Sequence, residues 1–194
     1  EFLLVFKDKG VWAITGNTPT TYELTRLNEE VGCLNKNCAI RYGNDVIFMD
    51  QNGIHSINAA TQSGSIIYAG VESDLVINTL KTLNYTQREK AFALHLPLRK
   101  ELWFCFPTAT YDYCDTALVY KYTRKQNSIV DMMTGQSQQS TDPSGWSLKT
   151  GLNLTAGLVY NNKFLTGSTT GYIQKWFGNS KYNNTAVTWR YRYP

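Results

Sequence analysis

The residues of this chain best suited to acid–base catalysis near neutral pH are its two histidines, His55 and His95. Histidine is the side chain whose ordinary pKa places its change of charge in this range. His55 follows Ile54 in a short apolar run, and His95 stands between two leucines, so both patterns predict β-strands. We expect each ring to face solvent or a neighbour within a sheet, and we expect neither to be catalytic.

Five aspartates lie in or near predicted turns, where two of them could form the carboxylate pair with which glycosidases cleave sugars. Aspartates in turns ordinarily accept hydrogen bonds from the backbone, and this is the role we predict here. The stretch 50–53 resembles the start of a calcium loop, but Thr61 stands where such a loop ends in glutamate. We therefore expect no metal site and no catalytic residue. The five are Asp45, Asp50, Asp112, Asp115 and Asp142.

Four cysteines, Cys33, Cys38, Cys105 and Cys114, could form two disulfides in an oxidising compartment, although their density is too low for a disulfide scaffold. Their spacings of five and nine residues do not match the short gaps of structural zinc sites. We predict buried free thiols. The sequence has no phosphate-binding loop, dinucleotide fingerprint or nucleophile elbow, so we expect no cofactor and no enzyme activity.

The composition favours strands and paired surfaces. Aromatic residues make up 13% of the 194 residues, whereas charged residues make up only 18%, below the ~25% of an average soluble domain. The formal net charge is +4, but the basic clusters at 88–90 and 99–101 each contain a glutamate, so no nucleic-acid patch is predicted. Because the chain begins inside one apolar strand pattern and ends just after an alternating one, we expect it to be a piece of a longer polypeptide.

The stretch 42–57 predicts a β-hairpin, because two apolar runs flank Asp50-Gln51-Asn52-Gly53 and Asn-Gly suits a type I′ turn. The same pattern returns at 160–175. In both copies a glycine follows a tyrosine by eleven residues, Gly53 after Tyr42 and Gly171 after Tyr160. The chain therefore repeats a β unit.

Four such units are predicted, at about 1–30, 37–70, 90–133 and 153–178, with a helical insertion at about 73–84 and a polar loop at 134–147. Their spacing of about 40 to 60 residues is typical of β-propeller blades, each with four antiparallel strands. The fold class we predict is all-β, a partial β-propeller; a barrel or a two-sheet sandwich is the alternative. Strands are expected at 2–7, 11–15, 22–27, 38–42, 46–49, 54–57, 65–69, 91–96, 102–106, 117–122, 128–132 and 154–159.

Tryptophans at five positions could form sugar-stacking platforms, although we expect most of them to fill the space between sheets. A carbohydrate-binding or glycan-cleaving propeller, with aspartate and tryptophan at its blade tips, is accordingly one alternative function. A cellular peptide-binding propeller is a second, for which the usual Trp-Asp blade signature is absent. The five are Trp12, Trp103, Trp146, Trp176 and Trp189.

Several short motifs follow one another along the chain: Phe-Leu-Leu-Val-Phe at 2–6, Gly-Val-Trp at 10–12, Thr-Gly at 15–16, Glu-Val-Gly-Cys at 30–33, Tyr-Gly-Asn-Asp-Val-Ile-Phe at 42–48, Asn-Gly-Ile at 52–54 and Thr-Gly-Tyr-Ile at 170–173. Their order resembles that of the tail nozzle or hub proteins, also called tail tubular proteins, of short-tailed bacteriophages.

This resemblance implies a non-enzymatic structural protein of the virion tail, assembled in the host cytoplasm. It implies a propeller that decorates a ring, commonly a homohexamer, around the DNA-ejection channel. The partners it implies are other copies of the chain, the adaptor and the fibres, while phage DNA would only pass through the channel. No catalytic residue and no cofactor is implied.

Overall fold

The computed structural model describes residues 2–29, 31–43, 45–57, 74–122, 145–177, 181–182 and 185–186. Most of these residues lie in antiparallel strands, so the protein is all-β in class. In chain order the elements are β1 (Phe2–Phe6), β2 (Val11–Thr15), β3 (Glu23–Asn28), β4 (Ala39–Tyr42), β5 (Asp45–Met49), β6 (Ile54–Ser56), helix α2 (Asp74–Leu80), 3-10 helix η1 (Tyr85–Lys90), β7 (Phe92–Leu96), 3-10 helix η2 (Pro97–Arg99), β8 (Glu101–Phe106), β9 (Cys114–Lys121), β10 (Gly145–Leu154), β11 (Ala156–Tyr160), β12 (Lys163–Gly167), β13 (Ile173–Lys175), β14 (Lys181–Tyr182) and β15 (Thr185–Ala186).

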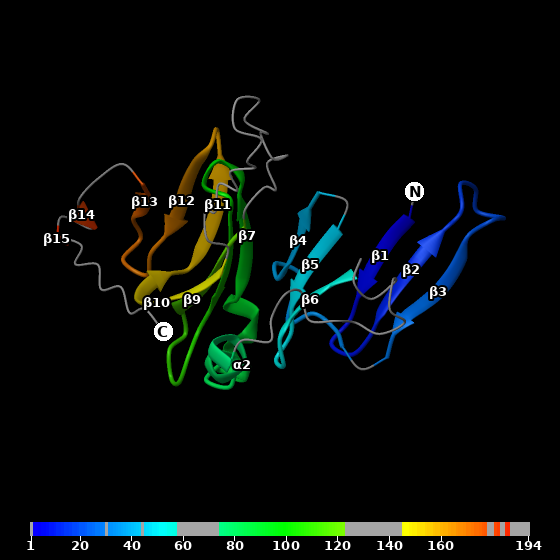
Figure 1. Ribbon diagram of the computed structural model, residues 1–194, viewed down its shortest axis with the longest axis horizontal. Helices are drawn as coiled ribbons and strands as arrows, with labels where there is room; N and C mark the ends of the chain where they lie inside the picture. Colours follow the sequence, from blue (N-terminus) through cyan, green and yellow to red (C-terminus); the bar gives the residue numbers. More distant parts are fainter. Residues whose placement is uncertain are drawn as a thin grey trace, which may run out of the picture.

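The strands form four main sheets that follow one another across the molecule in chain order (Figure 1). The first sheet is β1–β2–β3, the second is β4–β5–β6, the third is β7–β8–β9–β10 and the fourth is β11–β12–β13. Strands β14 and β15 form a separate pair. Each main sheet is a simple meander in which neighbours in sequence are neighbours in space, as expected when short turns join antiparallel strands.

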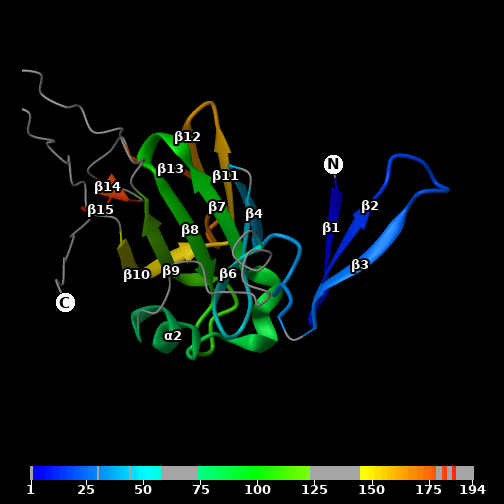
Figure 2. The same ribbon diagram turned by 45° about the vertical axis from the view of Figure 1, so that its right-hand side comes forward.

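The first strands of three sheets lie against one another. Strand β7 contacts β4 of the second sheet and β11 of the fourth, so the third sheet lies between these two sheets (Figures 1 and 2). Because each sheet begins with the strand nearest its neighbour, the later strands extend away from this line of contact. The short turns thus join strands within each sheet, and the sheets meet one another only side by side, so the result is a row of sheets and not one continuous sheet.

Both faces of the third sheet are buried. In β8, Phe104 belongs to the core shared with the first two sheets and with α2, whereas Trp103 belongs to the core shared with the fourth sheet. Both side chains are fully buried. Successive residues of a strand point to opposite faces, so the apolar run at 102–106 supplies both cores at once.

The first two sheets contribute to the core that contains Phe104. The rings of Phe6 in β1 and Phe48 in β5 lie 5.0 Å apart between their centroids. From α2, Val76 and Leu80 are buried in this core. The helical insertion predicted at 73–84 is confirmed over its α2 part, and it closes the core rather than projecting from it.

The predicted repeat is confirmed as two meanders of the same topology, β4–β5–β6 and β11–β12–β13. The predicted position of the type I′ turn is wrong. Neither Asn52 nor Gly53 has a positive φ, whereas Asn161 and Asn162 have φ values of 46° and 59°. Two left-handed residues in succession define a type I′ turn, so this turn joins β11 to β12.

The sequence analysis missed strand β10, because its first residues were assigned to the polar loop at 134–147, and it missed the short strands β14 and β15. Strand β10 is an edge strand of the third sheet, and many of its side chains are exposed, so it shows no apolar alternation. Its pairing with β9 shifts register between Thr150 and Leu154, next to Gly151 with a φ of 71°. The strands predicted at 65–69 and 128–132 lie outside the described residues.

We expect Phe104→Ala to lower the free energy of unfolding by about 3–5 kcal/mol, because truncating a fully buried aromatic ring removes apolar burial and leaves a cavity. Urea unfolding followed by fluorescence measures this change. Leu98→Ala is the matched control, since Leu98 is 72% exposed and its truncation should change stability by less than about 0.5 kcal/mol. Equal losses in the two variants would contradict the burial of the third sheet on both faces.

Candidate functional site

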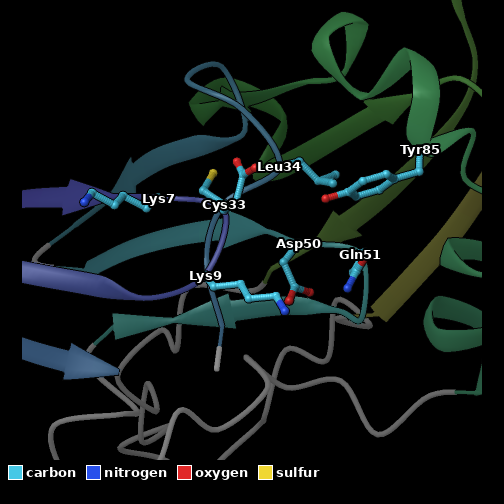
Figure 3. A pocket seen from close by; sticks show the side chains of 8 residues that line it. Lys7, Lys9, Cys33, Leu34, Asp50, Gln51 and Tyr85 are labelled. Atoms are coloured by element: carbon cyan, nitrogen blue, oxygen red, sulfur yellow. The ribbon is translucent and has the colours of Figure 1, made fainter. Parts of the chain in front are cut away.

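A groove of about 570 Å³ opens where turns from different parts of the chain meet; we call it the turn groove (Figure 3). Its walls come from the β1–β2 turn, the loop at 31–38, the β5–β6 turn and the start of η1. The lining residues are Lys7, Asp8, Lys9, Cys33, Leu34, Asp50, Gln51 and Tyr85.

The loop at 31–38, which we call the bridging loop, fixes the walls of the turn groove. The Cys33 N–H donates to the carbonyl of Lys7 (2.9 Å), and the Leu34 N–H donates to the carbonyl of Met49 (3.0 Å). Asn35 Nδ2 donates to the carbonyls of Arg88 (2.6 Å) and Ala91 (2.8 Å), at the entrance to the third sheet. One short loop is therefore bonded to three sheets.

Glycine at position 32 permits this close approach. A Cβ at Gly32 would lie 2.1 Å from the carbonyl oxygen of Lys7 and 2.4 Å from that of Asp8. Both neighbours are backbone atoms, which cannot move aside as a flexible side chain could. The sequence analysis assigned no structural role to Gly32 or Asn35, because these roles depend on contacts with residues remote in the chain.

Asp50 is held rigidly at the bottom of the β5–β6 turn. Its Oδ1 accepts hydrogen bonds from the N–H groups of Asn52 and Gly53, both at 2.7 Å, and lies 3.0 Å from Nε2 of His55. The Asp50 and His55 side chains are 8% and 1% exposed. The turn role predicted for Asp50 is confirmed, and a buried imidazole that packs on Phe48 supports it from below.

Of the two environments expected for His55, solvent or a sheet neighbour, the structure shows the sheet neighbour. His55 pairs with Phe48 across β5 and β6, and the two ring centroids are 5.3 Å apart. The signal that could have identified its burial is the apolar run around it, which continues on both sides of the ring at Ile54 and Ile57. A strand without alternation is buried on both faces.

His95 lies away from the turn groove and has a different environment. Its Nε2 lies 2.7 Å from the Tyr122 hydroxyl, and the Tyr42 ring meets its own ring edge-on at 5.5 Å. Partial burial lowers the pKa of His95 below its ordinary value, because removing water disfavours the imidazolium. The neutral ring therefore joins the second sheet to the third as a structural contact.

The other aspartates predicted as turn residues are spread over the molecule. Asp115 accepts hydrogen bonds from the Thr108 N–H and hydroxyl, both at 2.6 Å, and so braces the β8–β9 turn. Asp45 accepts from the Ser56 hydroxyl and from the N–H of Val46. Asp112 is exposed, and Asp142 lies outside the described residues. In the described part of the chain, no three His, Cys, Asp or Glu residues are grouped closely enough to hold a metal ion.

The four cysteines are buried free thiols, as predicted. Burial, with a smaller contribution from the nearby Asp50 carboxylate, raises the pKa of Cys33 to about 11. Burial also raises the pKa of Cys38, Cys105 and Cys114. Since the thiolate is the reactive form, these groups are poor nucleophiles at neutral pH.

Most of the described tryptophans pack between or against sheets, as predicted. Trp103 meets Trp176 edge-on at 5.5 Å within the core between the third and fourth sheets. Trp146 packs beside Tyr120 at the edge of the other core. Trp12 is the exception, because it lies on the outward side of the first sheet, and Trp189 lies outside the described residues.

Two sheet faces at the ends of the row are apolar and exposed. Leu4 and Phe6 turn toward the core, so the alternate residues of the first sheet turn outward, and the register aligns Leu3 with Ile14 and Leu24. The outer face of the first sheet comprises Leu3, Val5, Trp12, Ile14, Leu24 and Arg26; the outer face of the fourth sheet comprises Leu158, Tyr160, Lys163, Leu165, Ile173 and Lys175.

The exposure of these faces is large for apolar side chains. Leu24 is 64% exposed and Ile173 is 81% exposed. Single exposed apolar residues need no explanation, but a row of them across adjacent strands marks an interaction surface. Among the described residues of the second and third sheets we find no comparable apolar face, because neighbouring sheets cover them.

No family model and no curated protein matches the chain. Among the described helices, none is both long and apolar enough to cross a membrane. The described sheets and turns offer two kinds of candidate site: the turn groove, which is polar, and the apolar outer faces of the first and fourth sheets.

We expect Asp50→Ala to destabilise the protein by about 1–3 kcal/mol, because two backbone N–H groups and the His55 ring lose their common acceptor in a buried turn. Thermal or urea unfolding measures this loss. The exposed Asp112 provides the control, since Asp112→Ala should leave the unfolding transition almost unchanged. If both variants were equally stable, the Asp50 carboxylate would not be the element that fixes the turn.

The thiols should react with Ellman's reagent only slowly in the native state and rapidly in denaturant. A pKa of about 11 in place of 9.0 lowers the thiolate fraction of Cys33 at pH 8 by about 100-fold. Because the folded thiol keeps its proton to higher pH than the unfolded one, this contribution to stability is complete below pH 9 and is lost as the pH rises toward about 11. A fast native-state reaction, or a urea midpoint unchanged between pH 8 and pH 11, would contradict the assignment.

Proposed function

We propose that this chain is a non-enzymatic structural protein of a phage tail, a module of the nozzle or hub ring that surrounds the DNA-ejection channel. The observation that carries the proposal is the row of meander sheets, packed face to face and ending in exposed apolar faces. The order of motifs that resembles the phage nozzle proteins supplies the virion context.

The proposed architecture is part of a β-propeller, in which the sheets are blades. Propeller blades are antiparallel meanders that pack face to face around an axis, with their first strands innermost. The contacts of β7 with β4 and β11 support this arrangement, since each of the three is the first strand of its sheet. The blades proposed here follow the units 37–70, 90–133 and 153–178, of which 44, 58–70, 123–133 and 178 lie outside the described residues.

The first sheet fits the same scheme with a shifted strand assignment. The turns β1–β2 and β5–β6 both line the turn groove, so they lie at the same end of neighbouring sheets. Strand β1 then corresponds to β5, the second strand of its blade, and not to β4. This assignment makes β3 an outermost fourth strand, in the position that β10 has in the third sheet.

A mechanical role agrees with how the candidate catalytic groups are used. Asp50 and Asp115 fix turns, the histidines pack between or within sheets, and the thiols are buried. The exposed apolar faces supply what a ring needs, namely surfaces on which a neighbouring blade or subunit can pack. A closed ring arises when one face of a subunit packs on a different face of the next and the rotation closes; the homohexamer proposed here comes from the resemblance to phage nozzle proteins.

Electron microscopy of virions labelled through this chain tests the proposal directly. The expected result is a ring of label coaxial with the portal, in contact with the adaptor and fibres. Label that is absent from the tail, or that lies in the capsid shell, would overturn the phage-tail assignment.

We expect Leu24→Glu to weaken self-association of the purified chain, because it places a charge in the middle of the outer face of the first sheet. Sedimentation velocity over a range of concentrations measures the assembly state. Tyr111→Glu is the control: Tyr111 is 44% exposed in the turn between β8 and β9 and belongs to neither outer face, so this variant should associate like the wild type. A wild-type protein that stays monomeric at every concentration would contradict the role of these faces in assembly.

A further inference from the structure

The turn groove contains a carboxylate oxygen, Oδ2 of Asp50, to which no described residue donates a hydrogen bond. Oδ1 of Asp50 accepts three hydrogen bonds, whereas no hydrogen bond from the described residues reaches its Oδ2. The side chain is 8% exposed and lines the groove (Figure 3). Because this oxygen is open to the groove and a carboxylate oxygen only accepts hydrogen bonds, it is suited to a ligand that donates.

Donors stand next to this acceptor. Figure 3 shows the Lys9 side chain extending toward Asp50, with the Gln51 amide beside it. Within the described part of the chain, neither side chain forms a hydrogen bond or an ion pair. The groove thus presents an ammonium group, an amide and a carboxylate oxygen to the same space, and a matching ligand must both donate and accept.

The formal charges of the groove cancel. The Lys9 ammonium extends toward Asp50 (Figure 3), and the Asp8 carboxylate is paired with Arg88 at 2.8 Å. The Lys7 ammonium points away from the groove (Figure 3) and lies over the Trp12 ring. A groove without net charge does not select a polyanion such as a nucleic acid, whose affinity depends on uncompensated cations. A neutral ligand with several hydroxyl groups fits better, because each hydroxyl is both donor and acceptor.

Apolar surface completes the groove. Leu34 is 6% exposed at its base, and the Tyr85 ring is 46% exposed at its rim. The Arg88 guanidinium lies 4.5 Å from the centre of this ring and holds it in place. A volume of about 570 Å³, lined by apolar surface and a few directed polar groups, is typical of a small-molecule site.

We propose that the turn groove binds a neutral saccharide, either a free sugar or the terminal residue of a neutral glycan. Asp50 Oδ2 accepts from sugar hydroxyls, Lys9 and Gln51 bond the neighbouring oxygens, and Tyr85 packs on the apolar side of the ring. The site uses none of the residues of the outer sheet faces, so a failure to bind sugar would not contradict the assembly role, and a failure to assemble would not contradict sugar binding.

The test is a titration of the whole chain with methyl glycosides of glucose, galactose, mannose and N-acetylglucosamine, and with a neutral tetrasaccharide of each bound sugar. Binding is followed by saturation-transfer NMR and by amide shifts of Lys9, Gln51 and Gly53. We expect at least one sugar to bind saturably with an affinity in the millimolar range. Binding that is equal for monosaccharide and tetrasaccharide identifies a free sugar, and binding that increases with chain length identifies a glycan.

Two variants assign the binding to the groove. Lys9→Ala and Gln51→Ala change exposed turn side chains, and each should weaken binding by about tenfold, the effect of one lost hydrogen bond of about 1.4 kcal/mol. Lys163→Ala, at an exposed site on the fourth sheet, is the matched control and should bind as the wild type does. Affinity should not change between 50 mM and 500 mM salt, because the ligand is uncharged.

Three outcomes would overturn the proposal. They are the absence of saturable shifts with every sugar, binding that Lys9→Ala and Gln51→Ala leave unchanged, and stronger binding of an oligonucleotide or an oligoglutamate peptide that is lost at high salt. Folding of each variant is checked by its urea midpoint, so that loss of binding is not mistaken for loss of structure.

Discussion

The burial of the third sheet on both faces is the constraint on which the rest of the structure depends. Its central strand β8 carries the run Leu-Trp-Phe-Cys-Phe at 102–106, and all five side chains are almost completely buried. A sheet whose two faces are both apolar is stable only between two other layers. The second and fourth sheets supply these layers. Each of these sheets also has an outward side, and where that side is apolar it needs a further layer to cover it. The exposed outer faces arise where the described row of sheets ends.

The turn groove follows from how this row is tied together. Packing between sheets is non-directional, so it does not fix how far one sheet slides along the next. Directional contacts from the bridging loop do this, because its backbone and the Asn35 amide bond to the first, second and third sheets. The close approach at Gly32 requires a residue without a Cβ. With the sheets held in this register, their turns converge, and the groove is the space left between them.

Much of this fold could be predicted from the sequence, because local patterns determine local structure. The meanders at 2–27, 38–57 and 154–175 were readable from short apolar runs separated by turn residues. Strand β10 could not be predicted, since an exposed edge strand needs no apolar face. The type I′ turn was assigned to Asn52-Gly53 on composition, but the Asp50 carboxylate binds both N–H groups there and stabilises a different turn. Asn161-Asn162 adopts it because the flanking strands β11 and β12 are joined by only these two residues.

The candidate sites were less predictable, because they depend on which remote residues meet. Asp50 was correctly interpreted as a turn residue, yet its sequence neighbours do not reveal that Lys9 stands opposite it or that His55 is buried beneath it.

This arrangement separates stability from recognition within one carboxylate. Oδ1 belongs to the turn and cannot be spared, while Oδ2 is held rigid at no further cost and is left for a ligand. A binding group whose orientation is already fixed by the fold loses little conformational entropy on binding, which is why a turn that locks its own aspartate is a suitable place for a weak but selective sugar site. The outer sheet faces differ from the turn groove, because they are broad and apolar and have few directional groups that would select one ligand over another. A protein that combines the two can assemble through its sheets and still present its turns to a second partner.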